Sequence, residues 1–394
     1  MKQLILRLYI FLALLSSSVY AQNIFNKGGT SQKQYFTTIP YKEVKTKVII
    51  QCHINGKPYN FIVDTGAITA ISPALHKELN LPVISHVPIR DINEKVDSLQ
   101  MASLKNIQLG NVTFNDIPTL LIKDALLFDC FKVDGLIGSN LLRNSIVQFA
   151  SQTHTLIITD KAGILNLKRK DASKMLTSER QSDPIIVIEV INDKLHFTEE
   201  LLFDSGANSF YDFSYKSFKE LLANQNLLKV EAQAVGAYSI GLYGVSNEQE
   251  NYRIFVPELK INSYTFKNVT AATSHGGSLI GAQLFKYGTV TLDYINKKFY
   301  FEPYEKEPAN LTEKSWPFIP TAKDGKFVIG LVWDKIWEGK INPDDIILSF
   351  DGMNYENTDV CEALITDHTS KSSKATLVLK DPKTGALKEF EVTR

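Results

Sequence analysis

The sequence predicts a mainly β protein made of two copies of one β-rich lobe, followed by a small α+β unit. The phrase FIVDTGA at residues 61–67 returns as LLFDSGA at residues 201–207, about 140 residues later. The phrase GLIG at 135–138 returns as SLIG at 278–281, at nearly the same spacing. A repeat period of about 140 residues is too long for a solenoid and indicates two related lobes. The order of strand and helix signals changes in residues 315–394.

The first segment, residues 1–21, has the form of a signal peptide. Its start is positively charged, an apolar run follows from Leu8 to Leu15, and Val19 and Ala21 fit the small-residue rule for cleavage. The apolar run is too short to span a bilayer. We therefore expect an exported protein, periplasmic or secreted, with no membrane span and with a polar lead-in over residues 22–35.

Each lobe is expected to begin with a hairpin that leads into its Asp. In the N-terminal lobe, residues 36–166, two β-rich runs flank Asn55-Gly56, which is a strong hairpin turn. The C-terminal lobe, residues 184–304, restates this pattern with a return strand about three residues longer. The charged stretch 167–183 is the expected connection between the lobes.

The last unit, residues 315–394, follows a linker at residues 305–314. The runs DGKFVIGLVW, DDIILSFDG, ATLVLK and KEFEV are typical of strands, and TDVCEALITDH is typical of a helix with Thr358 as its N-cap. This mixture predicts a compact α+β module.

The repeated phrase places a carboxyl at the end of an apolar strand in each lobe. A carboxylate there is costly to bury unless something pairs with it. If the lobes pack about a pseudo-twofold axis, Asp64 and Asp204 meet. Two adjacent carboxyls cannot both ionise easily, so they share one proton and provide an acid and a base in one site.

The residues after each Asp suit such a pair. A glycine lets the backbone approach closely and turn sharply, and a hydroxyl can hydrogen-bond across the axis. A single Asp-(Ser/Thr)-Gly arises by chance in roughly one chain of this length in five, but two copies with matching downstream phrases do not. The expected supporting residues are Thr65, Gly66, Ser205 and Gly206.

With these motifs, residues 36–304 resemble the retropepsin-like and pepsin-like aspartic proteases. The resemblance rests on Asp64-Thr65-Gly66-Ala67, Asp204-Ser205-Gly206-Ala207 and the two apolar-apolar-Gly phrases. It implies two acid-protease β-barrel lobes, and a dyad that activates water for peptide hydrolysis without cofactor, metal or covalent intermediate. It also implies a flap, for which the segment around Tyr238 and Tyr243 is the candidate; an ordinary flexible loop is the alternative.

The last unit resembles a PDZ domain, because DDIILSFDG matches that family's Gly-Asp strand, with Asp344 in place of the Gly. A PDZ groove binds a peptide by strand addition. A module kept for packing or for positioning the lobes is the alternative.

Other site classes find little support. Basic and acidic residues balance at 43 each, which gives no electrostatic case for nucleic acid. The seven His have no metal-ligand spacing. Cys52 and Cys130 could form a disulfide, but we favour the interpretation that these two and Cys361 are small buried hydrophobes.

The expected function is that of an exported aspartic endopeptidase, a monomer acting on a peptide or protein substrate. One alternative is a peptide-binding protein on the same scaffold that has lost turnover. Another is an adaptor that acts mainly through its PDZ-like module and needs no dyad.

Overall fold

The computed structural model describes residues 24–123, 126–168, 171–193, 196–223, 228–312, 314–366 and 372–394. The signal peptide expected at residues 1–21 lies outside these ranges. Within them, no helix is both long and apolar enough to cross a membrane.

The chain is mainly β, as predicted. The first lobe contains ten strands and three short helices in its described part: β1 Phe36–Val44, β2 Lys47–Ile54, β3 Lys57–Asp64, β4 Ala70–Ile71, α2 Pro73–Leu79, β5 Ser85–Arg90, β6 Val96–Leu109, β7 Val112–Leu121, α3 Leu126–Phe131, β8 Gly135–Gly138, α4 Ser139–Leu142, β9 Ile146–Ala150 and β10 Thr155–Thr159. Two short strands, β11 Ala172–Lys174 and β12 Leu176–Thr177, follow before the second lobe.

The hairpin expected at the start of the first lobe is present. Strands β2 and β3 pair antiparallel, and Ile54 lies opposite Lys57. Asn55 and Gly56 have φ values of 53° and 78°, so both turn residues adopt the left-handed conformation that a type I′ turn requires. This turn fixes the register that carries β3 to Asp64.

The second lobe repeats this order of elements. Its described elements are β13 Pro184–Ile191, β14 His196–Asp204, β15 Tyr211–Ser214, α5 Tyr215–Ala223, β16 Lys229–Gly236, β17 Ile240–Gly241, β18 Gly244–Val245, β19 Gln249–Ile261, β20 Tyr264–Ser274, β21 Leu279–Gly281, β22 Gly288–Asp293, β23 Lys298–Pro303 and β24 Ala309–Asn310. Strands β13 and β14 pair antiparallel, as β2 and β3 do.

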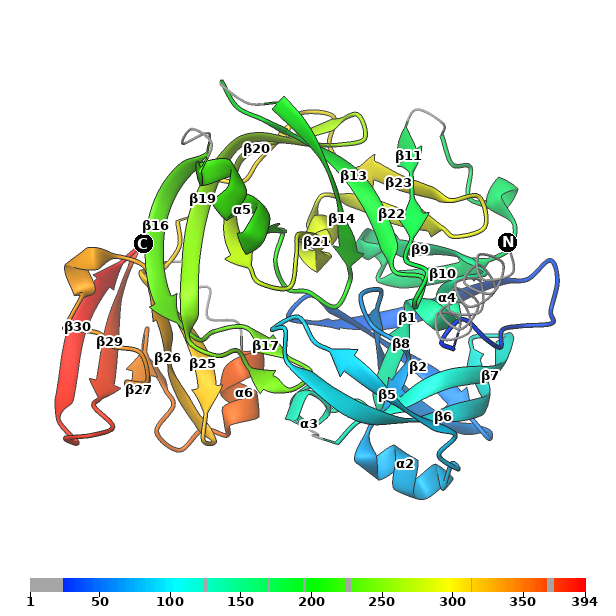
Figure 1. Ribbon diagram of the computed structural model, residues 1–394, viewed down its shortest axis with the longest axis horizontal. Helices are drawn as coiled ribbons and strands as arrows, with labels where there is room; N and C mark the ends of the chain where they lie inside the picture. The colour runs from blue at the N-terminus through cyan, green and yellow to red at the C-terminus, as the bar shows by residue number, and fades with distance from the viewer. Residues whose placement is uncertain are drawn as a thin grey trace, which may run out of the picture.

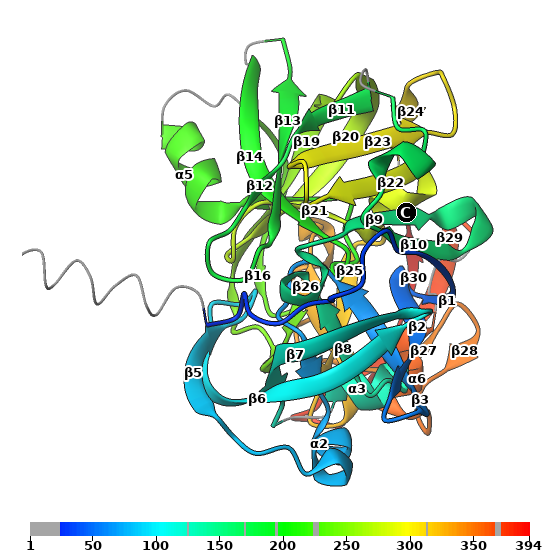
Figure 2. The ribbon, with the colours of Figure 1, turned by 90° about the vertical axis from the view of Figure 1, so that its right-hand side faces the viewer.

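The two lobes share a sheet and a core. Strand β22 of the second lobe pairs antiparallel with β9 of the first, with Val290 opposite Phe149, and the two strands lie side by side in Figure 2. Phe149 also stacks on Phe285 with ring centroids 4.7 Å apart, inside one apolar cluster drawn from both lobes. A shared sheet and core fix how the lobes are placed, which the site between them requires.

The C-terminal unit has its own sheet and its own apolar cluster. Its elements are β25 Phe318–Lys323, β26 Lys326–Val332, β27 Ile346–Phe350, β28 Met353–Asn354, α6 Val360–Ile365, β29 Lys374–Lys380 and β30 Leu387–Thr393. Thr358 was expected to cap the helix, but Asp359 does so, and its side chain accepts hydrogen bonds from the first-turn amides of Cys361 and Glu362. In Figure 1 this unit, orange to red, lies beside β16 of the second lobe, and its helix α6 lies next to α3 of the first.

A disulfide joins the C-terminal unit to the first lobe, and our interpretation of the cysteines was wrong for two of the three. Cys130 in α3 is bonded to Cys361 in α6, and their Cα atoms are 4.5 Å apart. Cys52 is buried and free, so the alternative of a Cys52–Cys130 bridge is also excluded. Sequence spacing could not reveal the pairing, because 231 residues separate the two partners.

Candidate active site

Asp64 and Asp204 each end a strand that runs parallel to the second repeated phrase of its own lobe. In the first lobe β3 pairs with β8, so that Asp64 lies opposite Gly138. In the second lobe β14 pairs with β21, and Asp204 lies opposite Gly281. The two sequence phrases of each lobe are therefore neighbours in space, and the same unit occurs twice.

The two units face each other closely. A Cβ atom added to Gly66 would lie 2.7 Å from the carboxyl carbon of Asp204. A Cβ atom added to Gly206 would lie 2.4 Å from the carboxyl carbon of Asp64. Each glycine thus leaves the space that the opposite carboxyl occupies, and a side chain at either position would push the dyad apart.

Four hydrogen bonds hold the two units together. The Thr65 hydroxyl donates to the Phe203 carbonyl at 2.7 Å and accepts from the Ser205 amide at 2.9 Å. The Ser205 hydroxyl in turn donates to the Val63 carbonyl at 2.8 Å and accepts from the Thr65 amide at 3.0 Å. Both side chains are fully buried. The cross-axis hydroxyl contacts expected from the sequence are therefore present, and they are reciprocal.

Each carboxyl also receives a backbone hydrogen bond from its own turn. The Gly66 amide donates to Asp64 Oδ1 at 3.0 Å, and the Gly206 amide donates to Asp204 Oδ1 at 2.7 Å. Burial raises the pKa of Asp64 well above its ordinary value, and the Asp204 charge raises it further. The nearby Lys47 and the Gly66 amide oppose this rise. The pair therefore retains a proton more readily than an isolated carboxyl does.

Two side chains beside the dyad escaped the sequence analysis. Lys47 Nζ donates a hydrogen bond to the Gly206 carbonyl. Gln181 Nε2 donates to the Gly66 carbonyl at 3.1 Å. Lys47 opens β2, and Gln181 lies just before the equivalent strand β13. Neither residue belongs to a repeated phrase, so the sequence carries no signal for either position.

A third carboxyl, Asp183, lies close to the pair. It accepts hydrogen bonds from Gln181 Nε2 at 2.6 Å and from Ser178 Oγ at 3.0 Å. Burial raises the pKa of Asp183 to about 7; these two hydrogen bonds oppose the rise, and the Asp204 charge adds to it. The segment expected to be only a connection between lobes thus contributes to the electrostatics of the site.

A loop of the second lobe contacts a turn of the first lobe, and Tyr243 lies at this contact. Tyr243 follows β17 and reaches the turn between β5 and β6 of the first lobe. Its amide donates to Asp91 Oδ2 at 3.2 Å, and its hydroxyl donates to the Ile89 carbonyl at 3.3 Å. Asn93 Nδ2 of the same turn donates to the Gly244 carbonyl at 3.3 Å. The first-lobe turn has neither Tyr nor Gly, so sequence reasoning missed its part in this contact.

Tyr238, the other flap candidate, lies at the base of the same loop and forms no hydrogen bond to the described part of the first lobe. Burial raises its pKa, and so does the negative charge of Asp212. The structure therefore brings Tyr243 to the first lobe and leaves Tyr238 nearer to the body of the second.

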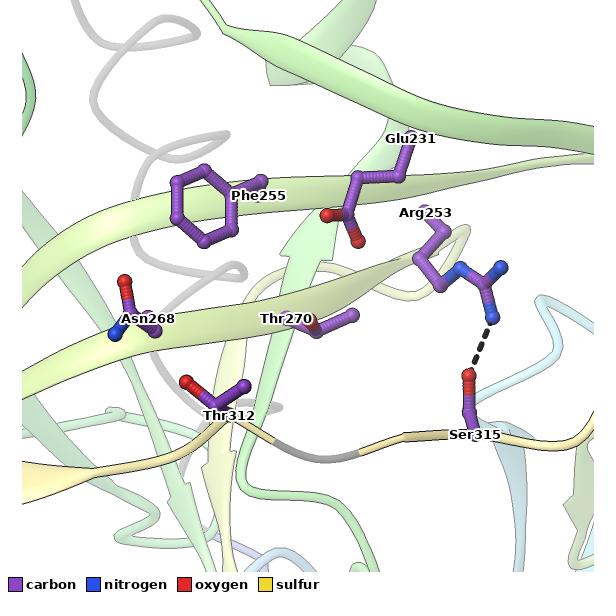
Figure 3. Close-up of a pocket in the computed structure, with 7 residues that line it drawn as sticks. All are labelled: Glu231, Arg253, Phe255, Asn268, Thr270, Thr312 and Ser315. Carbon is purple, nitrogen blue, oxygen red and sulfur yellow. Dashed lines mark hydrogen bonds between the residues drawn. The ribbon is translucent and has the colours of Figure 1, made fainter. Parts of the chain in front are cut away.

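Two cavities in the described part of the chain lie away from the dyad. One of about 460 Å³ lies on the second lobe beside the segment leading to the C-terminal unit (Figure 3), lined by Glu231, Arg253, Phe255, Asn268, Thr270, Thr312 and Ser315. Another of about 370 Å³ lies on the first lobe. No cluster of His, Cys, Asp and Glu suited to a metal ion occurs within the described ranges.

Comparisons with known proteins match this geometry in part. Residues 50–141, which include Asp64, match the family model described as aspartyl protease. A retropepsin-like aspartic protease from Rickettsia conorii matches with 18% identity over 32% of this chain and 94% of its own, at a TM-score of 0.25. Basic 7S globulin from soybean matches with 11% identity over 68% of this chain and 95% of its own, at a TM-score of 0.40. At such low TM-scores neither structure bears on what this chain does. No curated protein matches the chain.

Proposed function

We propose that this chain is an exported aspartic endopeptidase whose catalytic groups are Asp64 and Asp204. The observation that carries the proposal is the reciprocal set of cross-lobe hydrogen bonds between Thr65 and Ser205. These bonds hold the two carboxyls in one place at the centre of two lobes that share a sheet. A packing role alone does not call for two adjacent, partly buried carboxyls, which are costly to fold around.

The chemistry follows from one proton shared by two carboxyls. The ionised carboxylate of the pair takes a proton from a water molecule while the water oxygen bonds to the peptide carbonyl carbon. The protonated carboxyl of the pair donates its proton to the carbonyl oxygen; burial and the adjacent charge, which raise the pKa of Asp64, help to keep this proton on the pair. The nitrogen of the resulting tetrahedral diol takes the proton that the first carboxyl received from the water, and the C–N bond breaks. One diol hydroxyl returns its proton to the other carboxylate, which leaves an acid, an amine and the dyad in its starting state. This proposed reaction uses no cofactor, no metal and no covalent intermediate.

The test is peptide-library cleavage by the mature chain beside Asp64→Asn and Asp204→Asn. Each variant should lose nearly all activity and keep its circular dichroism spectrum, because both carboxyls belong to one proton circuit. Asp116→Asn is a matched control, since Asp116 only pairs with Lys105 at the surface. Single dyad variants that kept most of the activity would refute the shared-dyad mechanism.

The alternative is a protein that binds peptides on this scaffold without turning them over. The hydrogen bond from the Tyr243 amide to Asp91 favours this alternative, because it ties a loop of each lobe to the other and so restrains the lobes. A wild-type chain that bound library peptides by calorimetry and left them intact would support this alternative instead.

We also propose that the PDZ-like C-terminal unit positions the loop that bears Tyr243. The Ala237 amide, at the base of this loop, donates to the Gly330 carbonyl of β26 at 3.1 Å. A Cβ atom on Gly236 would lie 2.3 Å from that same carbonyl oxygen, so the two backbones touch. The Cys130–Cys361 bond ties the unit to the first lobe as well.

The other role proposed for this unit is substrate recruitment through a peptide groove. A Cys130→Ser, Cys361→Ser double variant, which lacks the disulfide, distinguishes loop positioning from recruitment. If the unit positions the loop, cleavage of short peptides and of folded proteins should fall together. If it recruits substrates, only cleavage of folded proteins should fall.

Export to the periplasm or the exterior is proposed from the signal-peptide pattern, and the disulfide supports it because such bonds persist in oxidising compartments. Mass spectrometry of the secreted or periplasmic chain should find Gln22 at the N-terminus. An intact Met1 on the folded protein would contradict this proposal. We further propose that the chain acts as a monomer, because one chain supplies both carboxyls.

A further inference from the structure

The turn between β1 and β2 reaches across to the catalytic segment of the other lobe. Lys47 is the first residue of β2, and its ammonium group donates to the Gly206 carbonyl in the second lobe. Beside it, the Thr46 hydroxyl donates to Asn208 Oδ1 at 3.1 Å. The turn is thus docked on the residues that follow Asp204, and the cation has a fixed place there.

That place is close to both carboxyls. The amide of Gly206 donates to Asp204 Oδ1 at 2.7 Å, and a Cβ atom on Gly206 would lie 2.4 Å from the Asp64 carboxyl carbon. The Lys47 ammonium lies one hydrogen bond, about 3 Å, from the Gly206 carbonyl oxygen, and that oxygen lies about 3 Å from the Cβ position of the same residue. With the 2.4 Å from this position to the Asp64 carboxyl carbon, the ammonium lies within about 9 Å of the Asp64 carboxyl. Charges at that separation interact strongly when they are screened only in part by water.

The charge of Lys47 is not taken up by a carboxylate of its own. Within the described ranges, no Asp or Glu oxygen forms an ion pair with it at 4.0 Å or less. Its other neighbour is the ring of Phe131, whose centroid is 6.0 Å from Nζ. Burial lowers the pKa of Lys47, whereas the charges of Asp64 and Asp204 raise it. The charges that favour its ammonium form are therefore those of the dyad.

The other charges around the dyad are mostly negative. Asp183 and Asp212 both interact with Asp204, and each has its pKa raised, first by burial and also by the Asp204 charge. Arg180 acts on Asp183, lowering its pKa. Lys47 is the cation whose charge acts on Asp64.

We propose that Lys47 is a positioning residue of the dyad: its ammonium group stabilises the state in which the two carboxyls share one proton and carry one negative charge. A fixed positive charge favours this singly charged pair over the neutral, doubly protonated pair. It likewise favours the loss of the second proton. Both limbs of the pH profile therefore lie at lower pH with Lys47 than without it.

The proposal rests on the proposed proteolytic function, and the first test is the pH profile of kcat/KM for peptide cleavage. In Lys47→Met, both limbs should move upward by about one pH unit. Lys47→Arg keeps the charge and should restore the wild-type profile to within about 0.3 unit. Lys42→Met removes a charge from an exposed position in β1 and should leave the profile in place.

A Lys47→Met profile that superimposed on the wild type would overturn the proposal. So would a Lys47→Arg profile displaced as far as that of Lys47→Met, because the side chain's shape rather than its charge would then matter.

A second readout needs no turnover. The carboxyl carbons of Asp64 and Asp204 can be titrated by NMR in protein labelled with ¹³C-aspartate. The apparent pKa values of the pair should rise in Lys47→Met and stay at the wild-type values in Lys47→Arg. If the wild type cleaves no peptide, the proteolytic function fails, while this titration still decides the role of Lys47. Unchanged values in Lys47→Met would refute that role whether or not the chain is a protease.

Discussion

Replacing Thr65 with Val removes one hydroxyl from the centre of the lobe interface. Valine has nearly the shape of threonine, so packing is kept while two hydrogen bonds are lost. The Phe203 carbonyl loses its donor at 2.7 Å, and the Ser205 amide loses its acceptor at 2.9 Å. Both losses occur where the side chains of Thr65 and Ser205 are fully buried, so water cannot replace the hydroxyl.

The expected loss of stability follows from these two unpaired backbone groups, the Phe203 carbonyl and the Ser205 amide. A buried backbone group left without a partner costs about 1 to 3 kcal/mol, so Thr65→Val should lower the free energy of unfolding by about 2 to 6 kcal/mol. Thr65→Ser keeps the hydroxyl and loses only a methyl group, which costs about 1 kcal/mol. Because the same bonds fix the carboxyls, a displacement of about 1 Å should also lower kcat/KM by about 100-fold in the valine variant alone.

The assay is urea unfolding followed by tryptophan fluorescence, beside kcat/KM on one peptide. The difference between Thr65→Val and Thr65→Ser isolates the hydroxyl from the methyl group. If the two variants unfolded within about 0.5 kcal/mol of each other, the hydroxyl would contribute little and the reasoning would fail. Equal kcat/KM values in the two variants would refute the link from these bonds to catalysis.

Three further perturbations test other parts of the site. Gly206→Ala should abolish cleavage, because the new Cβ would lie 2.4 Å from the Asp64 carboxyl carbon; a variant with activity within tenfold of wild type would contradict the close approach. Ala67→Thr with Ala207→Thr should add hydroxyl donors to the dyad and move the acidic limb of kcat/KM down by about one pH unit, from a mildly acidic wild-type optimum; an unmoved limb, or a wild-type optimum below about pH 3.5, would count against it. The pKa of Asp183 is raised to about 7, so its carboxyl stabilises the fold fully below its unfolded value of 3.8, and this stabilisation is lost as the pH rises through 7. Asp183→Asn should therefore gain about 2 to 4 kcal/mol over wild type on going from pH 4 to pH 8, and a constant difference in urea midpoints across that range would rule this out.

The dyad and its supporting residues could be placed from the sequence because each is repeated. Asp64 and Asp204 sit in two copies of one phrase, and repetition identifies a position without any knowledge of its contacts. The hairpin turn at Asn55-Gly56 was equally accessible, because its chemistry is local. Both predictions depend on patterns only a few residues long.

The neighbours of the dyad could not be placed in the same way. Lys47 and Gln181 occur once each, and nothing near them in the sequence distinguishes them from solvated surface residues. Their contacts with Gly206 and Gly66 depend on how the lobes dock, which is set by the sheet pairing of β9 with β22. The Cys130–Cys361 bond is nonlocal for the same reason.

That bond also has a consequence for the covalent integrity of the chain. It closes a loop that contains the whole second lobe, so a single backbone break anywhere between Cys130 and Cys361 releases no fragment. A molecule nicked in the exposed segment near residues 305–307 would run as one species on a non-reducing gel and as two after reduction. Closing a loop of 231 residues also removes about 5 kcal/mol of chain entropy from the unfolded state. A nick within the loop opens the ring and forfeits this restraint, so the cut protein should look whole under oxidising conditions and yet unfold more readily.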